Sequence, residues 1–532
     1  MQENNRKIAI VGSGLSAFGS ILAALDSNVT VTVLDIGEVL PPEISLKVSK
    51  IRGGTSSDVH TEVADLARQY SQIELAKRAM PKKTLFGSKY FYLEEQLRES
   101  HKLPYSQAMG GYSVAWGGAV LPPVNSDLTF DALTYQDLKI SMNALSKHIS
   151  LPFFEDSLTH HFPNYGGKSE GKNVILSSSQ KLLLERLSSI QDFDPEDTLI
   201  VGQSRLMTIT SGISSCRYCG MCSHGCVFSS IFSSEIEIKK LVQTGQIDYL
   251  SDCKVIQIGE DNNKAHIEYV NLKNGSSETF EADYVFVAAG AVNSTKIAIK
   301  SFGLEGEIVR FQKTGGFVRP YFSLKKIGFD WPTQNTQANI FMEIKDIKLS
   351  NFWIHSQVST PNEIVVLGLG HLSSRNLARL LSPLRKFFLA RLVIVMTNLH
   401  SSEGPFYELK AKSGGSGLQF HGDLKITKAY FKMEKTVELK IKRRLRKIGL
   451  IAIPFTKKGV SNGPGYHVGG SMPLGGKGKL ATDTLGRFSQ SSKISFVDTS
   501  VLPCIPATTI GFLTMANAYR ITAQVLKTQP FG

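Results

Sequence analysis

The feature that most constrains the fold of this chain is a glycine turn close to its N-terminus. The apolar run Lys7–Val11 is followed by Gly12-Ser13-Gly14-Leu15-Ser16-Ala17, which has the spacing G-x-G-x-x-A. An apolar stretch from Phe18 predicts a helix, and the run Val29–Leu34 predicts a second strand that ends at Asp35. Strand, glycine turn, helix and strand in this order are the context that a dinucleotide-binding fingerprint requires.

Each residue of this turn has a physical reason to stand where it does. Gly12 allows the tight turn, Gly14 lets the backbone approach a pyrophosphate, and Ala17 permits close packing of helix on strand. The helix N-terminus offers unpaired N–H groups and the positive end of its dipole to phosphate. Asp35 stands twenty-one residues after Gly14, where it can accept hydrogen bonds from a ribose. The motif predicts an α/β domain that binds FAD or NAD.

A second glycine-rich block spans residues 109–119, with the sequence Met-Gly-Gly-Tyr-Ser-Val-Ala-Trp-Gly-Gly-Ala. Four glycines around one tryptophan are too many for a packed helix or strand. Such a run suits backbone that lies against a flat ligand, and it also suits an ordinary glycine loop. Both interpretations stay open at the level of the sequence.

Length and composition set the class of protein. The 532 residues predict two or three domains, and 42% apolar with 20% charged residues is ordinary for a soluble globular enzyme. The sequence shows no transmembrane run of eighteen apolar residues and no signal peptide, so we expect a cytoplasmic protein. The net charge of +14 indicates either an anionic partner or a solvated basic surface. Motifs for nucleic-acid binding are missing, so we expect no nucleic acid as partner.

The middle of the chain predicts a second domain. The run Tyr284–Ala289 followed by a helix over Asn293–Lys300 reads as a return to the nucleotide-binding sheet. After it, aromatic and β-branched residues alternate in Phe317–Phe322 and Ile340–Ile344, and we expect a further strand over Tyr430–Val437. We therefore predict a discontinuous nucleotide-binding domain over residues 1–300 and 456–532. A substrate domain built on an antiparallel sheet with helices is predicted over residues 301–455.

Two segments of this region are rich in basic residues. Leu377–Leu399 is expected to be largely helical with a break at Pro383, and it is apolar with interspersed arginines and a lysine. It fits a membrane-surface element or a buried helix with basic side chains at its edges. Lys440–Lys447 is expected to be a basic helix that is either a solvated face or a contact for phosphate or lipid. Peripheral contact with an anionic membrane is therefore one hypothesis.

Four cysteines stand close together in the predicted loop over residues 211–230. Cys216, Cys219, Cys222 and Cys226 have the spacing C-x2-C-x2-C-x3-C, which is the spacing of bacterial ferredoxin loops. Val227 stands where those loops carry proline. The block is interpreted either as a metal site, in particular an iron–sulfur cluster, or as a reduced structural or redox-active loop. The isolated Cys253 and Cys504 are expected to be packing residues.

The C-terminal part adds Tyr466-His467-Val468-Gly469-Gly470 and the stretch Val497–Pro503. With these blocks the chain resembles the glucose-methanol-choline (GMC) oxidoreductases, flavoproteins that oxidise alcohols and sugars. The resemblance is carried by residues 12–17 with Asp35, 110–118, 288–294, 466–470 and 497–503. It implies a Rossmann-like FAD-binding domain with an inserted α+β substrate domain, and FAD rather than NAD as cofactor.

The resemblance also implies roles for individual residues. Gly12, Gly14 and Asp35 would hold the ADP half of FAD, and Val255 would lie at the adenine. Asp498 would bind near the ribityl chain or the pyrophosphate, and Ala289 belongs to a matching block. The residues implied along the pyrophosphate, ribityl chain and flavin edge are Gly110, Gly111, Ser113, Trp116 and Gly117. The N-terminus of the helix after Thr509 would face the flavin, where its dipole stabilises negative charge.

The implied reaction is oxidation of an alcohol, such as a sugar, a glycoside or a lipid-like alcohol. His467 would remove the hydroxyl proton while a hydride leaves for flavin N5, and the electrons would pass on to oxygen, a quinone, a cytochrome or another acceptor. Members of the family carry a second His or Asn near the last helix, and Thr509 stands at that place here. Thr509 is therefore the expected second catalytic residue, although a hydroxyl is no base. The alternative is an electron-transfer or non-catalytic flavoprotein.

Overall fold

The computed structural model describes residues 6–54, 59–70, 93–97, 102–128, 135–166, 173–366, 382–414, 417–459 and 466–528. It has a mixed α/β fold, as predicted. One parallel sheet runs in the order β21-β10-β1-β2-β6. Its strands are β1 (Lys7–Val11), β2 (Thr30–Leu34), β6 (Asp248–Leu250), β10 (Tyr284–Val287) and β21 (Ile494–Phe496). Strands from the start, the middle and the end of the chain thus form one sheet.

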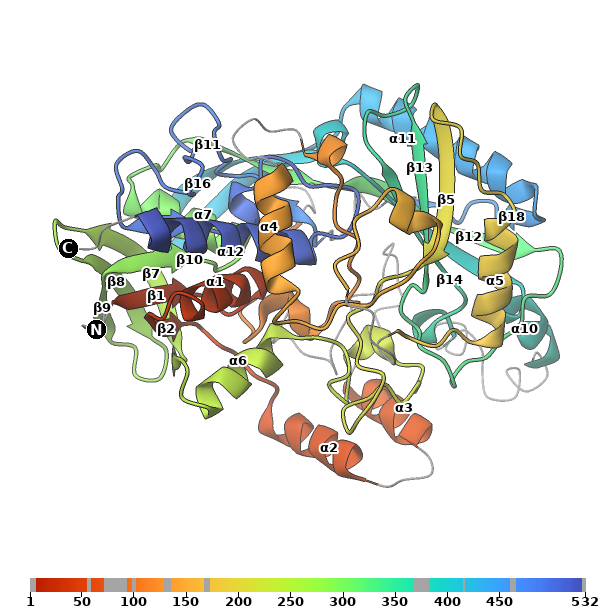
Figure 1. The fold of residues 1–532 in the computed structure, drawn as a ribbon, viewed down its shortest axis with the longest axis horizontal. Coiled ribbons are helices and arrows are strands. Elements are labelled where there is room, and N and C mark those ends of the chain that lie inside the picture. Colours follow the sequence, from red (N-terminus) through yellow and green to blue (C-terminus); the bar gives the residue numbers. More distant parts are fainter. Residues whose placement is uncertain are drawn as a thin grey trace.

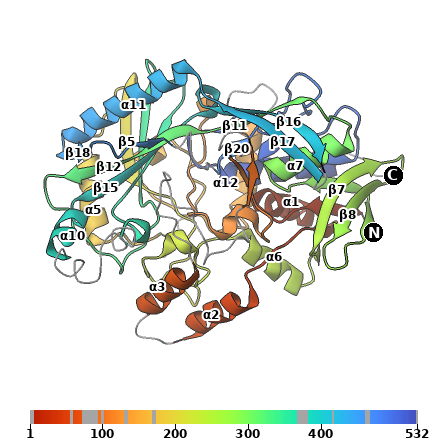
Figure 2. The ribbon, with the colours of Figure 1, turned by 180° about the vertical axis from the view of Figure 1, so that it is seen from behind.

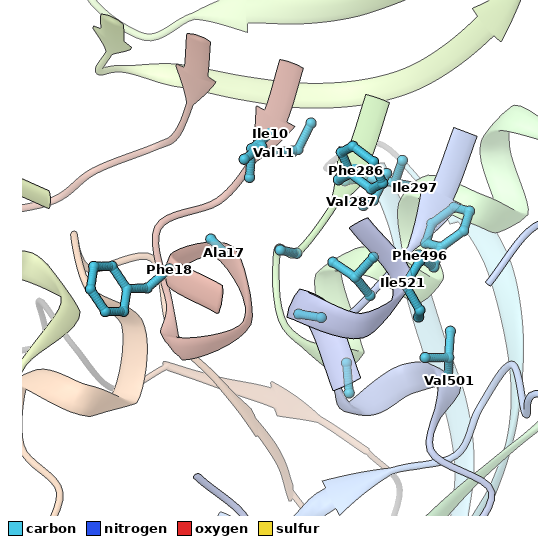
Figure 3. Packing of buried hydrophobic residues seen from close by; sticks show 14 of the residues in the cluster. Ile10, Val11, Ala17, Phe18, Phe286, Val287, Ile297, Phe496, Val501 and Ile521 are labelled. Carbon is cyan, nitrogen blue, oxygen red and sulfur yellow. The ribbon is translucent and has the colours of Figure 1, made fainter. Parts of the chain in front are cut away.

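The parallel sheet is buried beneath helices, which is why its strands are nearly continuous apolar runs. The helices nearest to it are α1 (Leu15–Leu25), α4 (Tyr135–Leu145), α7 (Ala291–Ser301) and α12 (Gly511–Thr528). The first and last helices touch through their backbones, since a Cβ on Gly19 would come within 2.3 Å of the Met515 carbonyl oxygen. Figure 3 shows part of this core, in which Val11, Phe286, Phe496 and Ile521 point into one apolar layer.

Two antiparallel sheets flank this unit. One is formed by β7 (Cys253–Glu260), β8 (Ala265–Asn271) and β9 (Ser277–Ala282), with the turn at Gly275 in the left-handed region at φ 76°. The other runs in the order β17-β16-β11-β20. Its strands are β11 (Ile308–Lys313), β16 (Phe406–Gly414), β17 (Gly417–Lys425) and β20 (Val468–Gly469). A short hairpin joins β3 (Leu93–Gln96) to β4 (Lys102–Tyr105).

The large second sheet is antiparallel throughout, as predicted. It runs in the order β18-β12-β15-β14-β13-β5, and β19 also pairs with β12. The strands are β5 (Asp197–Gln203), β12 (Gly315–Ser323), β13 (Ile340–Asp346), β14 (Ile354–Ser359), β15 (Leu392–Leu399), β18 (Leu450–Ala452) and β19 (Lys458–Gly459). Strand β5 comes from well before residue 301, so this sheet draws on both sides of the predicted domain boundary. Apolar residues of α5 (Ser178–Ser188) and α11 (Lys428–Arg446) pack on it.

Further helices lie outside these layers and complete the arrangement. They are α2 (Pro42–Gly53), α3 (Val59–Tyr70), α6 (Ser234–Gln243) and α10 (Ser382–Leu389). In Figure 1 the parallel sheet and β7–β9 lie at one end of the molecule, and α5, α10 and β18 lie at the other. Figure 2 shows the same separation from behind. Within the described part of the chain, no helix is long and apolar enough to cross a membrane.

Two predictions of secondary structure are wrong. Tyr430–Val437 is not a strand, because it lies in α11, where Tyr430, Val437 and Ile441 are buried at helical spacing. The Thr427 hydroxyl caps this helix by accepting a hydrogen bond from the Tyr430 N–H. The predicted helix over 377–399 covers α10 only. Residues 392–399 form the largely buried strand β15, and 377–381 lie outside the described residues.

Candidate functional site

A cavity of about 960 Å³ lies where the strands of the parallel sheet end. Ligands of open α/β sheets bind at this edge, beyond the carboxyl ends of the strands. The lining comes from segments that are far apart in the sequence: 11–16, 104–116, 253–256, 288–293, 466–468 and 510–514 among them. Segments from the start, the middle and the end of the chain therefore meet around one cavity.

The glycine turn lies at this cavity, and its two glycines serve different purposes. Gly12 has φ +100°, and a Cβ there would lie 2.6 Å from the Ala288 carbonyl oxygen, so the fold itself requires glycine. Gly14 has an ordinary φ of −70°, and a Cβ there would meet no atom within 4 Å. Packing does not require glycine at position 14, so the space beside it is available to a ligand. Ala17 is fully buried in the core, where the prediction placed it for packing.

Asp35 lines the same cavity and is held by two hydroxyl groups. Its Oδ2 accepts a hydrogen bond from the Tyr249 hydroxyl at 2.9 Å and a short one from the Ser13 hydroxyl. Burial raises the pKa of this carboxyl to about 6, although the hydrogen bonds act in the opposite direction. A buried carboxylate that already accepts from hydroxyl donors is chemically suited to a ribose. Val255, expected at the adenine, also lines the cavity.

The second glycine block meets the first at the cavity wall. The Ser13 hydroxyl accepts a hydrogen bond from the Gly110 N–H at 2.8 Å, and a Cβ on Gly111 would lie 3.4 Å from the Gly14 Cα. Gly111, Ser113 and Trp116 line the cavity, which favours the interpretation of the block as a ligand contact. Gly110 and Gly117 are absent from the lining, and the Gly117 carbonyl accepts from the Gln337 amide instead.

The N-terminus of α12 opens on the cavity beside Trp116. A Cβ on Gly511 would lie 2.3 Å from the indole Cζ3, so glycine allows the helix to begin directly against the ring. The indole Nε1 donates a hydrogen bond to the Phe232 carbonyl at 2.6 Å, which fixes the ring. Since the first N–H groups of a helix have no partner within it, α12 presents donors and a positive dipole end to the cavity.

Asp498 is almost fully buried and joins two segments of the site. Its carboxylate accepts hydrogen bonds from the Gly290 N–H at 2.8 Å, the Ser294 hydroxyl at 2.5 Å and the Ser500 N–H at 2.8 Å. Burial raises the pKa of this carboxyl above its usual range. Asp498 lines the cavity together with Ala289, and it also holds the turn after β10 in place. The binding of FAD by these two residues stays a prediction.

His467 lies on the cavity wall and is half-buried. Its carbonyl accepts a hydrogen bond from the Thr314 N–H at 3.4 Å, and the next residue pairs with Lys313 of β11. On its other side the Tyr466 ring meets the Tyr112 ring edge-on, with centroids 5.3 Å apart. The histidine therefore directly precedes the short strand β20, which pairs with β11. Tyr112 and Tyr466, on its other side, also line the cavity.

The residue expected to partner this histidine does not line the cavity. Thr509 is buried, and its hydroxyl oxygen accepts a hydrogen bond from the Leu121 N–H at 2.6 Å. Asn517 is fully buried in α12, where its side-chain oxygen accepts from Arg520. The structure thus brings His467 to the cavity and leaves Thr509 in the wall behind it.

The four clustered cysteines line one small cavity of about 20 Å³. All are free thiols, and backbone N–H groups of Thr336 and Ser230 approach the sulfurs of Cys222 and Cys226 at 3.4 and 3.2 Å. Burial raises the pKa of Cys219 to about 12. In the part of the chain that the structure describes, no group of three or more His, Cys, Asp or Glu side chains is arranged to hold a metal ion. The iron–sulfur cluster stays a prediction.

The cysteine loop lies close to the main cavity. Cys219 and Cys226 pack in the same apolar cluster as Tyr112 and Tyr466, two residues of the cavity wall. The interpretation of a redox-active loop near the cofactor therefore stays open. Cys253 and Cys504 are buried separately, as expected of packing residues.

Sequence reasoning missed the part of the cavity that comes from the hairpin of β16 and β17. Ser413, Gly414, Gly417, Leu418 and Gln419 all line the cavity. A serine–glycine run at 413–417 signals a hairpin turn, but it carries no information about what the hairpin covers. That this hairpin and the glycine turn line one cavity follows only from the tertiary fold.

Comparisons with known proteins agree with this architecture. No family model matches the chain, and no curated protein sequence does. Among solved structures, pyridoxine 4-oxidase from Mesorbium loti matches with a TM-score of 0.58 and 14% identity, over 98% of this chain and 99% of that one. A fungal aryl-alcohol oxidase matches with a TM-score of 0.57 and 10% identity, over 99% of both chains.

The fold is therefore that of the GMC oxidoreductases, to which both neighbours belong. The match covers nearly the whole chain, and the resemblance seen in the sequence motifs is confirmed at the level of the fold. At 10–14% identity the likeness establishes the fold alone.

Proposed function

We propose that this protein is an FAD-dependent oxidoreductase that oxidises the CH–OH group of a small-molecule alcohol. The observation that carries the proposal is the unused space beside Gly14 in a cavity that also contains Asp35 and His467. The residues proposed to bind the dinucleotide and the histidine proposed as general base thus line the same cavity. The names of the structural neighbours, pyridoxine 4-oxidase and aryl-alcohol oxidase, support an alcohol as substrate.

The residues of the cavity fit FAD. Asp35 and Val255 would hold the adenosine, and Gly14 with the N-terminus of α1 would hold the pyrophosphate. Trp116 and the N-terminus of α12 would border the flavin ring. When bound, FAD supplies the acceptor for the hydride that leaves the alcohol carbon. Two helix N-termini facing one cavity suit a ligand with a diphosphate and a ring system that becomes negatively charged on reduction.

His467 is the proposed general base. An imidazole accepts protons near neutral pH, and this one lies on the wall of the cavity, where a substrate hydroxyl could reach it. Its backbone is fixed by the hydrogen bond from Thr314 and by the pairing of β20 with β11. The rings of Tyr112 and Tyr466 pack edge-on beside this segment. We propose that removal of the hydroxyl proton by His467 makes the alkoxide from which hydride transfer is easy.

The resemblance in sequence implies a sugar, a glycoside or a lipid-like alcohol as substrate. It leaves oxygen, a quinone, a cytochrome or another molecule open as electron acceptor. The experiment that addresses the substrate is anaerobic titration of the flavin-loaded protein with a panel of alcohols. Loss of the visible flavin absorbance identifies a substrate, and subsequent admission of oxygen separates an oxidase from a dehydrogenase. Bleaching by none of the alcohols, in protein that carries flavin, would contradict alcohol oxidation.

A second function is favoured by the environment of Thr509. Because its hydroxyl oxygen accepts from the Leu121 N–H and lies outside the cavity lining, the position expected to assist His467 contributes nothing to the cavity surface. The chain would then bind FAD as an electron carrier or without catalysis. In that case flavin would be reduced by small electron donors and not by alcohols, which the same titration distinguishes.

A further inference from the structure

We propose that the end of the molecule farthest from the nucleotide-binding sheet docks onto the surface of an anionic lipid bilayer. The docking patch is built from the segment after β12 and from α10. It consists of three apolar and three basic residues: Leu324, Lys325, Lys326, Leu384, Lys386 and Phe387. Figures 1 and 2 show α10 and β18 together at this end, opposite to β7 and β8.

The apolar side chains of the patch are exposed. Leu324 and Leu384 are each 64% exposed, and Phe387 is 50% exposed. The centroid of the Phe387 ring lies 6.3 Å from that of Phe322 in β12. Phe322 in turn pairs with Ile451 of β18, which is also exposed. Neighbouring apolar side chains left open to water in this way mark an interaction surface, whereas isolated ones do not.

The two segments of the patch are fixed against one another by backbone hydrogen bonds. The Ser323 N–H donates to the Arg391 carbonyl at 2.7 Å, and the N–H groups of Ile327 and Gly328 both donate to the Ala390 carbonyl. These bonds hold Lys325 and Lys326 beside the C-terminal end of α10. The patch is therefore a preformed surface on ordered backbone.

Arg186 of α5 fixes the lysine pair from below. Its guanidinium donates to the carbonyls of Lys325 and Lys326 at 3.2 and 2.9 Å. The backbone polar groups of this turn are thereby satisfied by the protein, and both lysine side chains are exposed. The arrangement leaves the two ammonium groups available to an external partner.

The three segments that carry the patch and its apolar surroundings have basic residues and no acidic ones. No Asp or Glu occurs in residues 318–329, 382–399 or 447–459, the three segments that meet here. Within the described residues, Lys325, Lys326 and Lys386 form no ion pair. The Arg391 guanidinium lies 3.8 Å from the centroid of the Phe387 ring, which places a further positive charge on the apolar surface.

The basic run of α11 is partly neutralised. Lys440 pairs with Asp197 and Asp346, and Arg444 pairs with Asp192 and Asp197 at 2.7 and 2.8 Å. Lys442 pairs with Glu438 at 2.6 Å, whereas Arg443, Arg446 and Lys447 are exposed. Half of the basic side chains of this run are therefore held by carboxylates of the protein, whereas, within the described part of the chain, the lysines of the patch are not.

Exposed aromatic and aliphatic side chains among basic residues are the chemistry that recognises anionic headgroups above an acyl boundary. A soluble acidic partner would match the charge but leave the apolar side chains uncovered. The occupant that fits both features is the anionic membrane surface.

Ten residues of chain separate Leu324 from Thr314 beside His467, a span of about 33 Å for extended strand. Docking therefore leaves the cavity free, and the proposal stands independently of the proposed function.

The test is co-sedimentation of the full-length protein with vesicles. Vesicles of phosphatidylserine and phosphatidylcholine should bind the protein at low salt, vesicles of phosphatidylcholine alone should bind it much more weakly, and high salt should release it. The double variants Leu384→Ser/Phe387→Ser and Lys325→Gln/Lys326→Gln should each weaken binding at least tenfold. Thermal unfolding of the variants should match that of the unaltered protein.

Matched controls come from the far end and from α4. Leu272→Ser removes a side chain that is 47% exposed beside the turn between β8 and β9. Lys139→Gln/Lys147→Gln removes two exposed charges at the α4 helix. Both controls should bind like the unaltered protein. Failure to bind anionic vesicles, or equal loss in patch and control variants, would overturn the proposal. A dimer that Leu384→Ser/Phe387→Ser dissociates, without vesicle binding, would assign the patch to a second copy of the chain.

Discussion

The carboxylate of Asp498 accepts a hydrogen bond at 2.8 Å from the N–H of Gly290, a residue 208 positions earlier in the chain. The bond fastens the turn after β10 to the C-terminal block, and both segments line the main cavity. The same carboxylate accepts from the Ser294 hydroxyl and the Ser500 N–H. One buried carboxylate thus accepts hydrogen bonds from three residues and links the two segments at the cavity.

Replacing this carboxylate should destabilise the protein without a change in fold. Asp498→Ala leaves buried donors without an acceptor, and each costs about 1–3 kcal/mol. We therefore expect the free energy of unfolding to fall by about 3 kcal/mol, measured by urea denaturation in the absence of flavin. Asp498→Asn keeps one acceptor oxygen and should lose about half as much. Unchanged stability in the alanine variant would contradict the role assigned to Asp498.

The two glycines of the N-terminal turn should respond differently to alanine. In Gly14→Ala the new Cβ meets no protein atom within 4 Å, so the free energy of unfolding should change by less than about 0.5 kcal/mol. Affinity for FAD should nevertheless fall at least tenfold, because the methyl group occupies space meant for the ligand. Gly12→Ala is the comparison, and it should fail to fold stably because the Cβ meets the Ala288 carbonyl oxygen. Normal FAD affinity in Gly14→Ala would show that the dinucleotide lies elsewhere.

The pKa of Asp35, raised to about 6, predicts two opposite dependences on pH. Because the folded protein favours the protonated carboxyl, the stability of the flavin-free protein should decrease by about 2 kcal/mol as pH rises from about 4 to about 6. A ribose hydroxyl donates to the ionised carboxylate, so FAD affinity should increase about tenfold between pH 5 and pH 7. Equilibrium dialysis with FAD measures the second effect. Asp35→Asn should lack both dependences, and a variant that kept them would assign the titration to another group.

The cysteine loop should be unreactive in the native protein. Burial raises the pKa of Cys219 to about 12 and that of Cys222 well above its ordinary value, so both are thiols at pH 8. Alkylation at pH 8 should be at least tenfold slower than in denaturant, with mass spectrometry locating the label. Iron should be assayed in the same anaerobic preparation. Rapid labelling would contradict the buried thiol arrangement, and iron at cluster stoichiometry would establish the iron–sulfur prediction.

The parts of the fold that local patterns determine were predictable. The strand, glycine turn and helix around Gly12 and Gly14 follow from residue type and spacing, and the Ser177 cap of α5 follows from its capping box with Gln180. The error at Tyr430–Val437 arose because two aromatic and two β-branched residues suggest a strand when only a short window is read. Over the longer window to Leu445, the buried positions have helical spacing.

What depends on tertiary contact could not be predicted from the sequence. The resemblance places Thr509 at the second catalytic position, but no local signal shows that its hydroxyl oxygen accepts a hydrogen bond from the Leu121 N–H. The place of the β16–β17 hairpin in the cavity wall likewise has no local signal, and the ion pairs of Lys440 and Arg444 with Asp197 join segments more than a hundred residues apart. The exposed side chains of α10 form a patch only together with the segment after β12, to which backbone hydrogen bonds join them.

The measurement that tests the account most directly is the rate of anaerobic flavin reduction by an alcohol substrate in the unaltered protein and in His467→Ala. Both proteins must first be shown to carry FAD in equal amounts, so that the comparison concerns the proton transfer alone. If His467 is the general base, we predict that the variant keeps its flavin and that its rate of flavin reduction falls at least a hundredfold. Reduction at an unchanged rate in the flavin-loaded variant would contradict His467 as the general base of this site.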